Sequence, residues 1–131
     1  MIKLGILKST GGKSSSKPMH LAALNNLRIE GEYTIYECLP EDLKKTFDEL
    51  KRNKVRGLNV TIPHKIPVMS FVDKISERAK LIGAVNTIIF EEDGKSIGEN
   101  TDLHGFWNAI PKEIREQANG KEVALLGAGG A

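Results

Sequence analysis

The first 60 residues alternate between short apolar runs and stretches with helical spacing, and this alternation limits the folds open to the chain. Runs rich in aliphatic, β-branched and aromatic residues at 2–7, 33–39 and 55–60 predict buried strands. Stretches that begin at Ser16 and Pro40 place apolar residues along one helical face, with Ser16 as the expected cap of the first helix. Strands joined by helices pair in parallel through right-handed crossovers. The pattern predicts an α/β fold with three layers, α/β/α.

The second half of the chain predicts an antiparallel addition to this sheet. Apolar runs at 84–90 and 96–98 flank Glu92-Asp93-Gly94, which is a hairpin signal. Asn100-Thr101-Asp102 precedes a further helical pattern, and Asp102 is a candidate cap for it. We therefore expect a mixed, mostly parallel sheet rather than a purely parallel one.

The end of the chain indicates the start of a second unit. An apolar strand is expected at 123–126, and it leads into Gly127-Ala128-Gly129-Gly130-Ala131. A strand followed by Gly-x-Gly is how a Rossmann dinucleotide-binding domain begins. We expect one domain over 1–101, connecting helices over 102–120, and the first strand and glycine turn of a truncated second domain over 121–131.

Composition excludes several classes of function. The 131 residues carry 19 Lys+Arg against 17 Asp+Glu with the signs interspersed, so no basic surface for nucleic acid or an anionic membrane is expected. The single cysteine, Cys38, allows no internal disulfide and no cysteine zinc site, and it is expected to be a small buried hydrophobe. His20 and His104 have no partner at ligand spacing, so no metal is expected. The sequence has no apolar stretch of membrane length and favours a cytoplasmic protein.

Two further expectations concern burial. His64 is expected at a turn or on the surface. Five aromatic residues are expected in the core rather than on a stacking platform: Tyr33, Tyr36, Phe47, Phe106 and Trp107.

Polar residues interrupt the apolar strands where a ligand would bind. Asn59 and Thr61 lie on one side of a strand near its carboxyl end, where open α/β sheets bind ligands, and Lys65 follows Pro63. Asn86 and Thr87 break a second strand in the same way. Together with the serines at 14 and 16 and with Asp102, these groups suit a small, hydroxylated, anionic ligand. Individually, the lysine could be solvated and the aspartate a helix cap.

One rival interpretation is a phosphate-binding loop. Gly12-Lys13-Ser14 lies between a predicted strand and a predicted helix, as the end of a P-loop does. The first glycine of that motif should stand at position 7, which is Leu7. The spacing fails where the motif is strict, and a loop that ends in a serine cap is favoured instead.

Four ordered blocks resemble the substrate-binding domain of shikimate dehydrogenase. Asn59–Lys65 is identical to the family's N-V-T-I-P-H-K, and 82–87 matches I-G-A-V-N-T. Residues 100–106 match N-T-D-x-x-G-F, and 127–131 match the G-A-G-G-A that opens the cofactor domain. A fifth block departs from the family pattern G-x-P-I-x-H-S-x-S-P-x-M-H, because Lys13 replaces its histidine, Lys17 its second proline and Thr10-Gly11 its Pro-Ile.

The resemblance implies a reaction and a set of roles. The complete enzyme would reduce 3-dehydroshikimate to shikimate with NADP as cofactor, in aromatic amino-acid biosynthesis. Lys65 and Asp102 would be the catalytic pair, and the substrate would be bound by Ser14 and Ser16 at its carboxylate and by Asn59, Thr61, Asn86 and Asp102 at its hydroxyls. Gly127, Gly129, Gly130 and Ala131 would begin the cofactor site. The chain alone is expected to be inactive.

Alternatives remain open at this point. A relative that acts on quinate would share the same blocks, and the changed serine loop leaves the choice between the two acids open. A ligand-binding module without catalysis is the second alternative, although it would not need both Lys65 and Asp102. An apolar strand at 123–126 could pair with another chain, so a homodimer is a candidate assembly.

Overall fold

The computed structural model describes residues 1–11 and 13–124 and contains six strands and five α-helices in that part of the chain. The strands are β1 (Ile2–Lys8), β2 (Gly31–Glu37), β3 (Gly57–Val60), β4 (Lys74–Ile75), β5 (Thr87–Phe90) and β6 (Ser96–Glu99). The α-helices are α1 (Ser16–Asn26), α2 (Leu43–Arg52), α3 (Glu77–Ile82), α4 (Asp102–Ala109) and α5 (Lys112–Ala118). Two short 3-10 helices, η1 (Pro40–Asp42) and η2 (Pro67–Ser70), complete the set.

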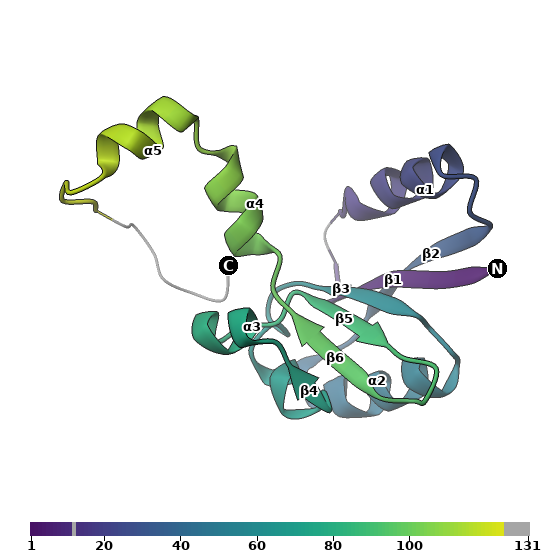
Figure 1. Cartoon of the computed structure of the whole chain (residues 1–131). Helices are drawn as coiled ribbons and strands as arrows, with labels where there is room; N and C mark the ends of the chain where they lie inside the picture. Colours follow the sequence, from purple (N-terminus) through teal and green to yellow (C-terminus); the bar gives the residue numbers. More distant parts are fainter. Residues whose placement is uncertain (12, 125–131) are drawn as a thin grey trace.

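The strands form one mixed sheet, as the sequence predicted, and their order is β2-β1-β3-β5-β6-β4 (Figure 1). β1 pairs in parallel with β2 and β3, and β4 pairs in parallel with β6. The hairpin β5–β6 is antiparallel, and β5 also runs antiparallel to β3. The two-residue strand β4 has no counterpart in the sequence prediction, because two residues are too short for any periodicity.

Helices cover both faces of the sheet, which confirms the three-layer prediction (Figure 1). α1 lies against β1 and β2 on one face, and α2 lies on the other. α2 is there because Leu43, Phe47 and Leu50 repeat at helical spacing and are all buried, while its charged residues point outward. Each such burial stabilises the fold by about 1.5–3 kcal/mol.

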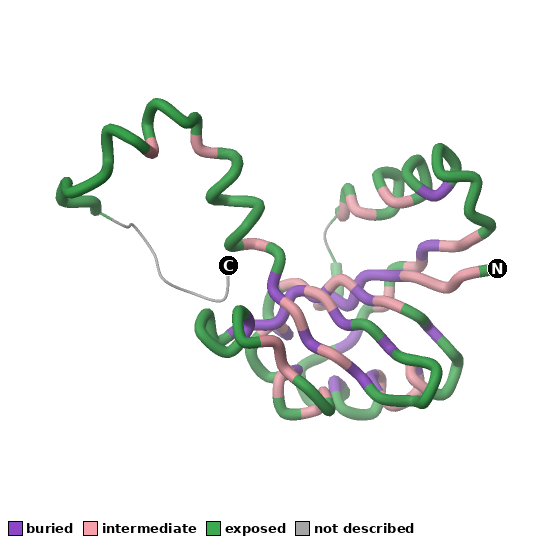
Figure 2. The backbone as a smooth tube through the Cα atoms, viewed as in Figure 1, coloured by how far each residue is buried: buried purple, intermediate pink, exposed green. Residues whose placement is uncertain are grey.

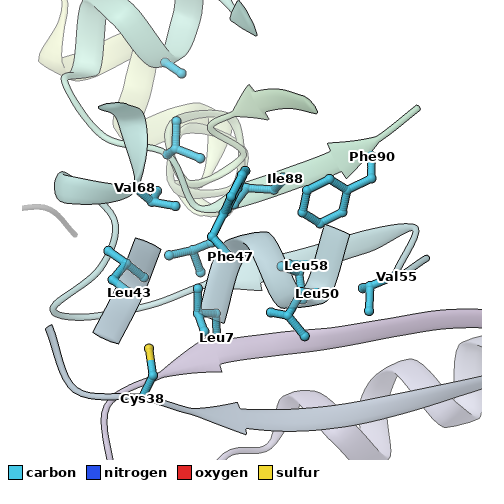
Figure 3. Close-up of a cluster of buried hydrophobic side chains, with 13 residues drawn as sticks. Leu7, Cys38, Leu43, Phe47, Leu50, Val55, Leu58, Val68, Ile88 and Phe90 are labelled. Carbon is cyan, nitrogen blue, oxygen red and sulfur yellow. The ribbon is translucent and has the colours of Figure 1, made fainter. Parts of the chain in front are cut away.

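The main hydrophobic core lies between α2 and the sheet (Figure 3). Leu7, Leu58 and Ile88 supply it from three neighbouring strands, and Phe47 packs against Phe90 with ring centroids 5.4 Å apart. Cys38 is buried in this cluster, as expected. Residues that alternate with these along the strands face α1 instead, and Asn59 and Tyr33 are among them.

The helices after Asp102 differ from the rest of the domain. Figure 2 shows them exposed, and within the described range neither α4 nor α5 contains a buried residue. The expectation that Phe106 and Trp107 belong to the core is therefore wrong: they are 65% and 53% exposed. Both rings project from a helix that the sheet does not cover. Of the predicted strand at 123–126, only Val123 and Ala124 are described, and both are exposed and outside any strand. The rest of it and the glycine turn at 127–131 lie outside the described residues.

Two kinds of feature are absent from the described part of the chain. None of its helices has the length and apolarity needed to cross a membrane. Among the same residues, no group of three or more histidine, cysteine or acidic side chains could hold a metal ion.

Candidate functional site

The predicted site residues gather at one edge of the sheet because of its topology. β1 and β3 are parallel, so the segments that follow them, which contain Ser14 and Thr61, leave from the same edge. β5 is antiparallel, so its beginning, next to Asn86, lies at that edge too: the Val60 amide donates to the Asn86 carbonyl at 2.7 Å. β6 reverses again and delivers Asp102 to the same place.

Lys65 and Asp102 form an ion pair at the centre of this edge. The Lys65 Nζ lies 2.7 Å from the Asp102 Oδ2, and the lysine side chain is only 11% exposed. The other carboxylate oxygen, Oδ1, accepts a hydrogen bond from the Asn86 Nδ2 at 2.7 Å. Both oxygens of Asp102 are therefore fixed, and they hold the ammonium group in place. A lysine held in this way can deliver or remove a proton at a substrate oxygen.

Both the oxygen and the nitrogen of the Asn86 side-chain amide form hydrogen bonds within the protein. Its Oδ1 accepts from the Thr101 amide at 3.0 Å and from the Thr87 hydroxyl at 2.9 Å, and its Nδ2 also reaches the Thr101 hydroxyl at 2.9 Å. The geometry makes Asn86 the residue that orients Asp102. Sequence reasoning places it among the substrate ligands, and its direct contact with a substrate stays a prediction.

Asn100 has no individual role in the sequence prediction, and the structure gives it a clear position. It is 1% exposed, and its Nδ2 donates to the Ala84 carbonyl at 3.0 Å. Its Oδ1 accepts from the Asp102 amide at 2.9 Å and so satisfies the start of α4. Asp102 is therefore the first residue of α4 rather than its cap, and its carboxylate is available for Lys65.

The serines lie at the start of α1. Ser16 is the first residue of the helix, so the expectation that Ser16 caps it is wrong: the cap position is Ser15, whose side chain makes no capping bond. Instead, the Ser16 amide donates to the Ser14 hydroxyl oxygen at 3.2 Å. Both serines are partly exposed, so their hydroxyls can still meet a ligand.

Tyr33 connects this group to the strand residues, and sequence reasoning assigns it only to the core. Its hydroxyl donates to the Asn59 Oδ1 at 2.6 Å, and its ring stacks on His20 at 4.5 Å. Burial raises the pKa of Tyr33 to about 12, against a smaller opposing effect of a hydrogen bond with the Ser16 side chain. Because Oδ1 of Asn59 is occupied, its Nδ2 is the group left for a ligand. No local pattern distinguishes such a tyrosine from an ordinary buried one.

The hollows in the surface do not coincide with this cluster. One hollow, of about 760 Å³, lies on the charged outer face of α2 and contains none of the predicted residues. A hollow of about 310 Å³ reaches Asn59 and Thr87 beside His20 and Tyr33, but it lies mainly over the α1 face of the sheet. We locate the site by its converging polar groups, because an open hollow among solvated lysines has no chemistry that selects a ligand.

His64 is fully buried, which corrects the expectation of a turn or surface histidine. Its Nε2 lies 3.2 Å from the Cys38 carbonyl oxygen and 3.6 Å from the Cys38 Sγ, because the turn after β3 folds the ring onto the end of β2. Its Nδ1 has no hydrogen-bond partner among residues 1–11 and 13–124. Desolvation raises the pKa of the Cys38 thiol, which makes it less reactive.

Comparison with known proteins gives a consistent match. Residues 10–88 match the family described as the shikimate dehydrogenase substrate binding domain. The shikimate dehydrogenase (NADP(+)) of Methanocaldococcus jannaschii is 43% identical over 128 residues, which are 98% of this chain and 45% of that protein. The chain thus spans less than half the length of this relative.

Solved structures match in shape as well. The crystal structure of shikimate 5-dehydrogenase from Thermus thermophilus in complex with shikimate has a TM-score of 0.81 and 34% identity, over 99% of this chain and 49% of that one. The ligand-free 5-ketofructose reductase of a Gluconobacter strain has a TM-score of 0.76 and 31% identity, over 80% of this chain and 38% of that one.

Proposed function

Because the chain belongs to the family of shikimate dehydrogenase substrate-binding domains, we propose that it binds shikimate and 3-dehydroshikimate as part of an NADP-dependent shikimate dehydrogenase. The observation that carries this proposal is the cluster of Lys65, Asp102 and Asn86. A largely buried lysine side chain beside a fixed carboxylate is suited to giving a proton to a substrate oxygen.

The proposed roles follow from the donors and acceptors present. The hydroxyls of Ser14 and Ser16 hold the substrate carboxylate, because hydroxyl donors to a charged acceptor form strong hydrogen bonds. The Asn59 Nδ2 and the Thr61 hydroxyl address ring hydroxyls, together with Asn86 and Asp102. In the direction of reduction, the Lys65 ammonium gives a proton to the ketone oxygen and becomes a neutral amine, which solvent reprotonates.

When bound, NADPH, the reduced form of NADP, would supply the hydride that adds to the ketone carbon and would leave as NADP(+). Lys65 fits that chemistry, since a carbon that receives a hydride leaves an oxygen that must receive a proton. The residues expected to begin the cofactor site, Gly127, Gly129, Gly130 and Ala131, lie outside the described part of the chain, so their role is a proposal from sequence alone. We also propose, from sequence alone, that the chain divides into 1–101, 102–120 and 121–131. A homodimer and a cytoplasmic location are likewise proposals.

The direct test is a titration of shikimate into the isotope-labelled chain, followed by NMR. Saturable shifts are expected around Ser14, Thr61 and Lys65. Ser14→Ala should weaken binding by about tenfold, because it removes a hydrogen bond to a charged group worth about 1.5 kcal/mol. Ser15→Ala is the matched control, since that neighbouring side chain is exposed and makes no capping bond.

A second pair of variants tests the central lysine. Lys65→Met should also weaken binding, whereas Lys74→Met removes an exposed lysine in β4 and should leave it unchanged. A folded chain in which shikimate produces no saturable shifts would contradict the proposal.

The similarity to a 5-ketofructose reductase supports a second candidate, a polyol ketone without a carboxylate. Titrations with quinate and with 5-ketofructose separate these substrates. If the serines bind a carboxylate, Ser14→Ala weakens the binding of shikimate or quinate and leaves the binding of the uncharged ketone unchanged.

A further inference from the structure

We propose that Lys8 is a positioning residue for the serines at the start of α1, and so helps to decide which acid the site accepts. The inference rests on the proposed function in one respect, namely that Ser14 and Ser16 bind the substrate carboxylate. It goes beyond that function because Lys8 stands at the first position of the serine block, where the family pattern has glycine, so the pattern assigns it no role.

Lys8 is a buried charge at the end of β1. The residue is 7% exposed, and lysine is rarely buried to this extent unless its charge is paired. Its Nζ donates to the Glu37 Oε1 at 2.8 Å, to the Ser9 carbonyl at 2.8 Å and to the Gly11 carbonyl. An ammonium group has three N–H bonds, and these three acceptors use all of them.

Glu37 stands beside Lys8 because the two residues pair in register across β1 and β2. A hydrogen bond and the charge of Lys8 hold the pKa of the Glu37 carboxyl below its ordinary value. The loop is held at two points, because the Ser9 and Gly11 carbonyls both accept from the Lys8 ammonium group.

The backbone at Gly11 shows that this loop shape is specific. Its φ of +78° is in the left-handed region, which favours glycine and which other residues rarely adopt. In this conformation the Gly11 carbonyl accepts a hydrogen bond from the Lys8 ammonium group.

Gly11 lies close to the serines along the chain. Ser14 is three residues further on, and three residues span at most about 10 Å, so a Gly11 carbonyl anchored on Lys8 limits where Ser14 can lie. The Ser16 amide in turn donates to the Ser14 hydroxyl oxygen, which joins Ser14 to the first turn of α1.

Lys8 does not itself bind the ligand in this arrangement. All three of its donors are used and Glu37 neutralises its charge, so no net attraction remains for a carboxylate. This is the difference from the exposed Lys13 and Lys17, which can meet an anion directly.

The test compares Lys8→Met and Glu37→Gln in the labelled chain. Methionine keeps the apolar stem of Lys8, and Lys8→Met should move the Ser14 and Ser16 amide resonances before any ligand is added. The substitution should lower the affinity for shikimate by about tenfold, as expected for loss of one well-placed hydrogen bond to a charged group. Lys8→Arg should restore part of the affinity. Lys3→Met is the matched control. Lys3 lies at the opposite end of the same strand, and its ammonium group also donates to a backbone carbonyl, that of Asn53.

Two further readouts separate positioning from loss of stability. Methyl shikimate lacks the carboxylate charge, so the difference in affinity between shikimate and its ester should shrink in Lys8→Met and in Glu37→Gln. Combining the two substitutions should add little to the effect of Lys8→Met alone, since both act through one loop. Glu37→Gln keeps the test valid if Lys8→Met fails to fold, because Glu37 is near the surface.

The outcomes are distinguishable from failure of the proposed function. If the unsubstituted chain binds no shikimate, the function is wrong, while shifted Ser14 and Ser16 resonances in Lys8→Met still support the positioning role. If Lys8→Met and Glu37→Gln fold, bind shikimate as the unsubstituted chain does and leave both resonances in place, the inference about Lys8 is wrong.

Discussion

At the scale of single residues, the role of a side chain here depends on which of its atoms the protein has already occupied. The Asp102 carboxylate pairs with Lys65, while the Asp102 amide donates to Asn100 at the start of α4. Asn59 presents its Nδ2 because Tyr33 occupies its Oδ1. The residue type thus permits several roles, and the neighbours select one.

Tyr33 gives a pH-dependent prediction. Burial raises its pKa from 10.0 to about 12, so between these values the unfolded chain releases a proton that the folded chain keeps. The stabilising contribution is complete below pH 10 and is lost as the pH rises towards about 12. The free energy of unfolding, measured with denaturant, should therefore fall more steeply with pH in this range for the unsubstituted chain than for Tyr33→Phe. Equal pH slopes in the two proteins would contradict the assignment.

At the scale of elements, the stability of the short helix α3 depends on Ser76, the residue that immediately precedes it. Six residues cannot sustain a helix by propensity alone. The Ser76 hydroxyl oxygen accepts from the Ala79 amide at 3.1 Å, and the same hydroxyl donates to the Glu99 Oε1 at 2.8 Å. One side chain thus caps α3 and ties it to the end of β6, directly before Asn100.

Ser76→Ala should lower the free energy of unfolding by about 1 kcal/mol, the usual cost of losing a serine cap. Ser70→Ala is the matched control, since that exposed hydroxyl bonds only to the Pro67 carbonyl. Urea unfolding of both variants measures the difference. A Ser76→Ala variant as stable as Ser70→Ala would show that α3 needs no cap.

At the scale of the whole molecule, the stable part of the described chain extends just past Asp102. The core, the sheet and the Lys65–Asp102 cluster are complete by the first turn of α4. α5 contributes no buried residue, and it meets α4 through Arg115, whose guanidinium lies 5.5 Å from the centre of the Trp107 ring.

A chain shortened to residues 1–111 should therefore keep its fold and its ligand. Its Tm should fall by less than about 4 °C, which corresponds to about 1 kcal/mol or less for a domain of this size. A chain that ends at Glu99 should be much less stable, because it leaves Asn86 and the Ala84 carbonyl without their partners. Calorimetry of the two chains tests this, and a large loss of stability in 1–111 would show that α5 supports the core.

The strand and helix alternation, the hairpin, the buried face of α2 and the polar residues at the strand ends could all be predicted from the order of residues. These features are local, because apolar spacing and turn residues act over a few neighbouring positions. The alternation of Asn59 and Thr61 therefore follows from the order of residues alone, as do the motifs that carry the family.

Which of these groups contact one another depends on how distant segments pack in the folded chain. Lys65 and Asp102 are 37 residues apart, and the reversal of β5 and β6 brings them to 2.7 Å. The same holds for the buried His64, for Tyr33 on Asn59 and for Lys8 on Glu37, each held by a partner at least 26 residues away. Burial and hydrogen-bond partners depend on packing between distant segments, and a local pattern contains no information about the identity of that distant segment.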